Sequence, residues 1–357
     1  MSKCVRVVVV DDSAYSRRSI TKMLDGFAGI QVVGYAANGE EGIRRVIDLK
    51  PDLVTLDIAM PKMDGFSLLR ILTNRFSIPV VVVSALGCAD NVFKALELGA
   101  FDFISKPSNR ASERLLGIRD ALRSKVLLAA DLKQGGKRKP EQFVERDAQR
   151  YTSSRPESQP GDGLPHPFDI VAIGASTGGP PALQSIFSAF DRQLPFAVVV
   201  SQHMPAGFTR AFAERLNRSS AFTVKEAEEG DVVLAGRILI APGGMNLVVE
   251  NHDGEIIVRV VPPSPDDRYT PSVDVMFASC AGVYGKRMLA VVLTGMGNDG
   301  SKGLRSVKEQ GGFIVAESDE TAVVYGMPRE AVATGLVDRV LPLQHVAHEI
   351  LFRGDFL

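Results

Sequence analysis

Residues 53–65 read LVTLDIAMPKMDG, a short apolar run that ends in Asp57 and continues into a loop shaped by proline and glycine. Similar unbroken runs lie on either side of it, as VRVVVV, QVVGYAA, PVVVVSA and FDFIS. Runs of this kind are typical of strands that are buried on both faces of a parallel sheet. Amphipathic segments separate them, so residues 3–128 are predicted to alternate five strands with five helices, joined by right-handed crossovers.

The chain divides into two folded regions and a tether. We predict a first domain at residues 1–130, a flexible linker at 131–167 and a second domain at 168–357. The linker loses all apolar periodicity and fills with Pro, Gly, Ser, Gln and charged residues, which is typical of a solvated tether. After it, runs such as DIVAIGAS and RMLAVVLTG predict a doubly wound, mainly parallel α/β domain. NLVVENHDGEIIVRVV predicts an antiparallel hairpin within it, with its turn at Asp253 and Gly254.

Composition excludes several classes of function. The 357 residues carry 41 Lys plus Arg against 42 Asp plus Glu, and a net charge of −1 offers no global field for binding nucleic acid. The three cysteines lie far apart and lack metal-ligand spacing. No apolar stretch approaches the roughly 20 residues that cross a bilayer, and the N-terminus does not resemble a secretory signal. We therefore expect a cytoplasmic protein without membrane insertion.

Charged and polar residues follow the predicted strands of the first domain at the points where these strands end. They are Asp11, Asp12, Asp57, Ser84 and Lys106. The carboxyl ends of strands in an open α/β sheet meet at one crevice. Three carboxylates placed there would repel one another unless a hard cation such as Mg²⁺ lay between them. A metal-bound carboxylate can attack a phosphoryl group while the cation and a lysine neutralise charge, and Asp57 is the candidate acceptor.

This constellation resembles the receiver domains of response regulators, which have a flavodoxin-like, five-stranded parallel sheet. The resemblance implies that a histidine kinase phosphorylates Asp57, with Asp11 and Asp12 helping to hold Mg²⁺. It also implies that Ser84 and Lys106 contact the phosphoryl group. Phe103, three residues before the lysine, matches the aromatic switch position of receivers.

In the second domain, the segment DIVAIGASTGGPPALQSIF places Ser176 between a strand and a helix. The glycines allow a tight turn, and the N–H groups at the start of the helix favour an oxyanion. A serine needs a neutral imidazole as base and a carboxylate that orients it. His203 ends the next strand and Asp299 follows a later one, so all three residues are expected at one edge of the sheet.

Other interpretations of these residues stay open at this point. A serine at a strand-helix junction is commonly a helix N-cap. The sequence GMGNDG at 295–300 is also a literal G-x-G-x-x-G, and Glu317 lies about where a dinucleotide-binding fold keeps its ribose-binding acid. A nicotinamide-dependent oxidoreductase is therefore one alternative. A response regulator whose second domain only binds partners is another.

The second domain resembles the catalytic domain of the CheB chemotaxis methylesterases. The motifs that carry the resemblance are GASTGGP, SQHMP, APGG, PSVD, TGMGNDG and VVYGMPREAV. The resemblance implies that Ser176 is the nucleophile, His203 the general base and Asp299 the residue that orients the base. The backbone N–H groups of Thr177 and Met296 would be the oxyanion donors. The implied substrates are glutamyl methyl esters of chemoreceptors, hydrolysed to release methanol without a cofactor, and in many members receptor glutamines are deamidated as well.

The resemblance also implies regulation, because in this family the unphosphorylated receiver covers the esterase cleft. We therefore expect removal of residues 1 to about 160 to raise basal activity. Two features depart from the family pattern. Asn246 stands where a histidine is common, and the linker is longer and more charged than expected.

Overall fold

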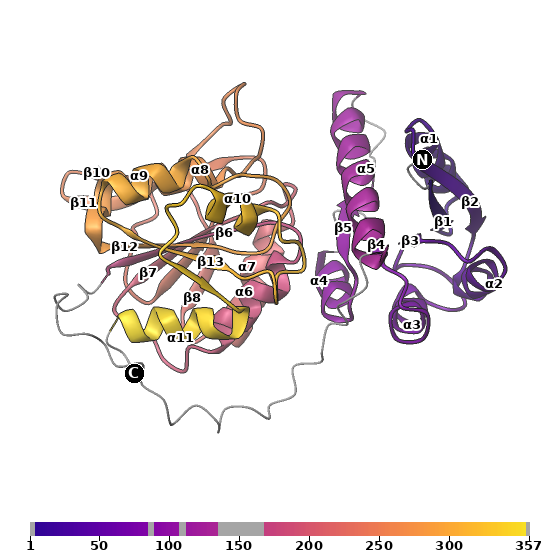
Figure 1. The fold of residues 1–357 in the computed structure, drawn as a ribbon, viewed down its shortest axis with the longest axis horizontal. Coiled ribbons are helices and arrows are strands. Elements are labelled where there is room, and N and C mark those ends of the chain that lie inside the picture. The colour runs from indigo at the N-terminus through magenta and orange to yellow at the C-terminus, as the bar shows by residue number, and fades with distance from the viewer. Residues whose placement is uncertain (1–3, 85–88, 107–111, 135–167, 355–357) are drawn as a thin grey trace.

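The computed structural model describes residues 4–84, 89–106, 112–134 and 168–354, which form two α/β domains that pack against each other (Figure 1). Most of the predicted linker, residues 135–167, lies outside the described residues. Among the helices that are described, none combines the length and the apolar character needed to span a bilayer.

The first domain contains a parallel sheet of five strands in the order β2-β1-β3-β4-β5. Its strands are β1 (Val5–Val10), β2 (Ile30–Ala36), β3 (Leu53–Leu56), β4 (Val80–Ser84) and β5 (Asp102–Ser105). All four residues of β3 and all five of β4 are buried, because helices cover both faces of the sheet. The prediction of a flavodoxin-like sheet is confirmed, since this strand order is the one that defines that fold.

Helices connect these strands, and the side chains of Ser13, Asn38 and Asp64 cap the first three of them. They are α1 (Ala14–Asp25), α2 (Gly39–Leu49), α3 (Gly65–Ile71), α4 (Ala89–Glu97) and α5 (Ser112–Gln134). Before α2, Asn38 Oδ1 accepts from the backbone N–H of Glu41 at 3.0 Å, and Glu41 Oε2 accepts from the backbone N–H of Ala37 at 2.9 Å. This reciprocal cap fixes the start of α2. Helix α5 runs past residue 130 to Gln134, and the domain boundary at 130 stays a prediction.

The second domain is built on a seven-stranded parallel sheet in the order β14-β13-β12-β6-β7-β9-β8. Its strands are β6 (Ile170–Ala175), β7 (Ala197–Gln202), β8 (Thr223–Glu226), β9 (Arg237–Ile240), β12 (Met288–Val292), β13 (Phe313–Glu317) and β14 (Arg339–Leu341). The five inner strands are those expected from apolar runs. The two edge strands, β8 and β14, were not predicted, because they are short and carry charged residues.

Helices and a hairpin complete this domain. The helices are α6 (Gly179–Ser188), α7 (Thr209–Ser219), α8 (Val273–Tyr284), α9 (Gly303–Glu309), α10 (Met327–Ala333) and α11 (Leu343–Arg353). Strands β10 (Asn246–His252) and β11 (Glu255–Val261) pair antiparallel. Asp253 and Gly254 have φ of 51° and 91° at the turn, so the predicted hairpin and its turn are confirmed.

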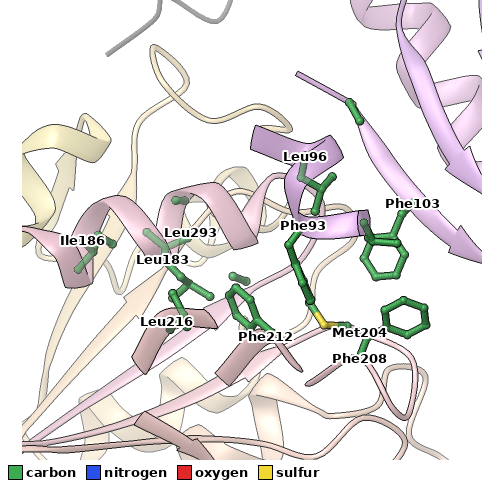
Figure 2. Close-up of a cluster of buried hydrophobic side chains, with 14 of the residues drawn as sticks. Phe93, Leu96, Phe103, Leu183, Ile186, Met204, Phe208, Phe212, Leu216 and Leu293 are labelled. Carbon is green, nitrogen blue, oxygen red and sulfur yellow. The ribbon is translucent and has the colours of Figure 1, made fainter. Parts of the chain in front are cut away.

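An aromatic cluster joins the two domains (Figure 2). The rings of Phe93 in α4 and Phe212 in α7 stack with centroids 5.3 Å apart. The ring of Phe103 in β5 lies 4.9 Å from that of Phe208, which directly precedes α7. All four side chains are almost fully buried. The α4–β5 face of the first domain therefore packs against helices α6 and α7 and against the loops that precede them, at the carboxyl edge of the second sheet, where Ser176 and His203 are located.

Candidate active site and acceptor pocket

The predicted acceptor pocket of the first domain forms where four neighbouring strands, β1, β3, β4 and β5, end. Asp11 and Asp12 follow β1, Asp57 follows β3 and Lys106 follows β5. The Nζ atom of Lys106 lies 2.6 Å from Asp57 Oδ2 and 3.0 Å from Asp11 Oδ2. Ser84 ends β4, and its carbonyl accepts from the backbone N–H of Lys106 at 2.7 Å. The structure thus brings the five predicted residues to one edge of the sheet.

The carboxylates of this pocket fit a divalent cation. One oxygen from each of Asp11, Asp12 and Asp57 can be chosen so that the three lie within 4.8 Å of one another. Burial raises the pKa of Asp11, and the charge of Asp57 adds to this, although Lys106 and the N–H of Ser13 oppose it. Ionised Asp11 is therefore short of compensating positive charge. A hard cation that prefers oxygen ligands would supply that charge.

The nucleophile loop of the second domain connects β6 to α6. Ser176 is half-buried, its backbone N–H donates to the carbonyl of Thr294 at 3.0 Å, and its own carbonyl accepts from Gly179 at 2.8 Å. Gly178 has a φ of 82°, and a Cβ atom at this position would lie 2.7 Å from Cβ of Val323. The glycine therefore lets the chain turn sharply enough to present Ser176 at the end of the strand.

His203 and Asp299 form a hydrogen-bonded pair next to this loop. Nε2 of His203 lies 2.7 Å from Oδ2 of Asp299. The same carboxylate accepts from the backbone N–H groups of Val273 and Asp274, at 2.7 and 3.0 Å, and from the hydroxyl of Ser272 at 3.2 Å. Burial opposes ionisation of Asp299, but His203 and these N–H groups at the start of α8 outweigh it, so the pKa of Asp299 lies below its usual value. The carboxylate is ionised and fixed in place.

Gln202 links the proposed nucleophile to the proposed base through their main chains. Its Nε2 donates to the carbonyls of Ser176 and His203, at 2.9 and 3.1 Å, and its side chain is buried. Within the described part of the chain, no direct hydrogen bond joins the side chains of Ser176 and His203. Catalytic hydrogen bonds are often loose before substrate binds. Gln202 was not predicted from the sequence, because its only signal there is its position at the end of a strand beside the histidine.

Two backbone N–H groups near Ser176 are suited to an oxyanion. Those of Thr177 and Met296 meet no acceptor among the residues that the structure describes. The loop that carries Met296 lies against Ser176, since a Cβ atom on Gly295 would come within 2.7 Å of Cβ of Ser176. These are the two donors expected from the sequence, and both keep a free N–H.

The contacts of Glu317 and of the G-x-G-x-x-G segment do not favour nucleotide binding. Glu317 is fully buried, and its two carboxylate oxygens accept from the backbone N–H of Thr294 and the hydroxyl of Thr321, at 2.8 and 2.9 Å. It is not accessible to a ribose. Asp299, inside the glycine-rich segment, is bound to His203. Two of the residues that suggested a nicotinamide cofactor, Glu317 and Asp299, therefore bond to other residues of the same domain.

The first domain contacts the nucleophile loop directly. Oγ1 of Thr177 donates to Oδ2 of Asp102 at 2.5 Å. The same carboxylate oxygen lies 2.8 Å from Nζ of Lys125, which also donates to the carbonyl of Phe103 at 2.9 Å. Phe103, the predicted switch residue, packs on Phe208 of the second domain. Neither Asp102 nor Lys125 was singled out from the sequence.

Comparison with known proteins gives matches for both domains. Residues 171–350 match the CheB methylesterase family, and residues 7–116 match the response regulator receiver domain. A relative from Geobacter sulfurreducens, named protein-glutamate methylesterase/protein-glutamine glutaminase 3, is 54% identical over 99% of this chain and 98% of its own length. A similarly named protein from Myxococcus xanthus is 45% identical over 95% of this chain and 94% of its own. The crystal structure of the Thermotoga maritima CheB methylesterase catalytic domain is 40% identical, with a TM-score of 0.51, and covers 52% of this chain and 98% of that one.

Proposed function

Because the chain belongs to the CheB methylesterase family, with a receiver domain in front, we propose that it hydrolyses glutamyl methyl esters through Ser176, His203 and Asp299. The observation that carries this proposal is the His203–Asp299 pair, with its 2.7 Å separation, beside the nucleophile loop. Serine attack requires a neutral base that is oriented by a carboxylate, and the low pKa of Asp299 keeps that carboxylate ionised.

The ring nitrogen of His203 that is not bonded to Asp299 is the one that would accept the serine proton during acylation. Asp299 holds the Nε2–H, so the neutral imidazole has its lone pair on Nδ1. As Ser176 Oγ attacks the ester carbonyl carbon, its proton passes to Nδ1. The N–H groups of Thr177 and Met296 stabilise the oxyanion, and removal of one such donor in related chemistry costs roughly 3–4 kcal/mol. Collapse of the intermediate breaks the bond to the methoxy group, which takes the proton from His203 and leaves as methanol.

Deacylation repeats the same chemistry with water. His203 accepts a proton from the attacking water, and Ser176 Oγ leaves and takes that proton back. The product is a free glutamate side chain. An amide substrate would pass through the same acyl-enzyme and release ammonia, which is consistent with relatives that carry both the methylesterase and the glutaminase names.

We propose that the substrates are methyl-accepting chemoreceptors and that the phosphodonor is a histidine kinase. The protein itself would act in the cytoplasm. Asp57 would accept the phosphoryl group. Asp11, Asp12 and Asp57 would hold Mg²⁺, which neutralises charge on the transferred oxygens, and Ser84 and Lys106 would contact the phosphoryl group.

The contact between the domains supports an inhibitory role for the unphosphorylated receiver. Asp102 holds Thr177, the residue after the nucleophile, and Phe103 packs beside it on Phe208. Phosphorylation of Asp57 would change the position of Lys106 and thereby of β5, which carries Asp102 and Phe103. Separation of this face would open the cleft around Ser176.

Methanol release from methylated receptor membranes tests the proposed chemistry. We expect Ser176→Ala to abolish release while circular dichroism shows an unchanged fold. Ser188→Ala is a matched control, because Ser188 is exposed at the end of the helix that follows the nucleophile. Release at the wild-type rate by Ser176→Ala would exclude Ser176 as the nucleophile.

A further inference from the structure

The ring of Tyr269 stacks on the imidazole of His203. The two centroids lie 5.0 Å apart and the planes differ by only 3°, which is the geometry of an offset parallel stack. Tyr269 is half-buried in the loop before α8. It belongs to none of the residues that carry out the proposed proton transfers.

The hydrogen bond from His203 to Asp299 leaves one freedom of the imidazole unrestrained. A single hydrogen bond at Nε2 restrains that atom, but Nε2 lies closer than Nδ1 to the axis of the Cβ–Cγ bond, so the ring can still turn about that bond. Such rotation moves Nδ1, the atom that must accept the serine proton. A flat surface against one face of the ring removes this rotation, and Tyr269 provides that surface.

The hydroxyl end of Tyr269 lies close to the backbone of Gly297. A Cβ atom at residue 297 would come within 2.2 Å of the phenolic oxygen, so the hydroxyl end of Tyr269 occupies space that is available only because residue 297 is glycine. Gly297 directly follows Met296, one of the proposed oxyanion donors. The phenol therefore spans from the general base to the oxyanion loop.

The loop that carries Tyr269 is anchored by Asn246. Nδ2 of Asn246 donates to Asp267 Oδ2 at 2.6 Å, and its Oδ1 accepts from the backbone N–H of Ser272 at 2.8 Å. Asn246 is buried, and its two partners lie on either side of Tyr269 in the sequence. Ser272 also donates to Asp299. The side chain of Asn246 thus fixes both ends of the segment 267–272, which carries Tyr269. This gives a structural role to Asn246, the residue that stands where a histidine is common in the family.

From these contacts we infer that Tyr269 is a positioning residue for the general base, acting through its ring to keep Nδ1 of His203 directed at Ser176. The inference rests on the proposed function, because it requires His203 to be the base. The aromatic ring carries the effect, whereas the hydroxyl is needed only for packing against Gly297.

Variants of the full-length protein separate these contributions. Tyr269→Leu removes the ring, Tyr269→Phe keeps it, and Tyr35→Leu is a control at an exposed tyrosine of the first domain. We expect Tyr269→Leu to lower kcat for methanol release by about 10- to 100-fold with little change in KM, since small misplacement of a catalytic group has costs of this size. Labelling of Ser176 by a fluorophosphonate, which needs the same base, should slow by a similar factor. Tyr269→Phe should restore both rates to within about threefold of the wild type.

A spectroscopic measurement reports on His203 itself. The Nε2–H proton bound to Asp299 should give a sharp downfield NMR resonance in the wild type and in Tyr269→Phe, and a broadened one in Tyr269→Leu. Tyr269→Met serves if the leucine variant does not fold. Wild-type kcat and labelling rates in a folded, ring-free variant would overturn the inference, as would a Tyr269→Phe variant as slow as Tyr269→Leu. If Ser176→Ala retained full activity, the proposed function itself would fail, and this result is distinct from either outcome.

Discussion

The hydroxyl of Thr177 donates a 2.5 Å hydrogen bond to the carboxylate of Asp102, and this bond joins the receiver domain to the residue after the proposed nucleophile. Both residues are buried. The backbone N–H of Thr177 is a proposed oxyanion donor, so the receiver holds the side chain of a residue whose main chain would serve catalysis. In the proposed regulation, this bond would stabilise the closed arrangement next to Ser176.

Removing this bond should raise basal esterase activity. Thr177→Val keeps the backbone N–H but removes the hydroxyl that Asp102 accepts from. A hydrogen bond to a charged group contributes about 1.5–3 kcal/mol, so we expect at least a roughly tenfold rise in unstimulated methanol release if closure limits activity. Thr223→Val, at an exposed position on edge strand β8, should leave the rate unchanged.

A double-mutant cycle shows whether the effect comes from this contact. Asp102→Ala should raise basal activity by itself, and the double variant with Thr177→Val should rise no further than the larger single effect. Strictly additive effects, or no rise in either single variant, would show that the hydrogen bond does not restrain the enzyme.

Removal of the whole receiver should have a larger effect in the same direction. A truncation that lacks residues 1 to about 160 loses Asp102 together with Phe93 and Phe103, which cover Phe212 and Phe208. We expect its activity to exceed that of the unphosphorylated full-length chain and to be insensitive to phosphodonors. A folded truncation with lower activity than the full-length chain would argue against occlusion.

Asp57→Asn should abolish stimulation by a small phosphodonor such as acetyl phosphate in the presence of Mg²⁺. The substitution removes the proposed acceptor while keeping a side chain that can accept from Lys106, which now bonds Asp57 at 2.6 Å. Asp64→Asn is the matched control, because asparagine replaces Asp64 well as the N-cap of α3. Equal stimulation of the Asp57 variant would remove Asp57 as the acceptor.

Much of this arrangement could be predicted because it depends on where strands end. Asp57, Ser176 and His203 each follow a buried apolar run, and the edge of a parallel sheet brings such positions together. Tyr269 could not be found in this way. It lies in a loop without periodicity, and only the folded chain brings its ring to His203.

The residues that form the domain interface could also not be predicted from the sequence. The contact between Asp102 and Thr177 joins residues of two separately folded regions, and no local pattern encodes which faces of two domains meet. Gln202 could not be predicted for a related reason. A strand-end glutamine has many uses, and its two hydrogen bonds to the carbonyls of Ser176 and His203 depend on the exact turn of the loops.

Asp299→Asn tests the orientation of the base. The change should lower kcat by roughly 10⁴-fold, as in other serine hydrolases whose histidine loses its carboxylate partner, because the amide favours the wrong tautomer. Asp274→Asn is a close control, since Asp274 lies at the start of the same helix and accepts from the N–H groups of Lys302 and Gly303, not from His203. Comparable losses in the two variants would indicate disruption of α8 instead of a specific effect on His203.

Asp11→Asn should stabilise the receiver at neutral pH in the absence of divalent cations. The pKa of Asp11 is raised by burial, so the folded chain binds this proton more tightly than the unfolded chain. Stability then falls as pH rises through the interval between the usual carboxyl pKa and the raised one, and above that interval the full penalty remains. Asparagine never ionises and can still accept from the N–H of Ser13, as Asp11 does at 2.9 Å.

In thermal melts with a chelator, the Asp11→Asn variant should therefore unfold at a higher temperature than the wild type at pH 7, and the difference should shrink as the pH is lowered into the acidic range. Added Mg²⁺ should raise the melting temperature of the wild type and have little effect on the variant, because the substitution removes one of the three carboxylates that would hold the ion. A variant that is less stable than the wild type in the chelator at pH 7 would show that the ion pair with Lys106 outweighs the burial of Asp11.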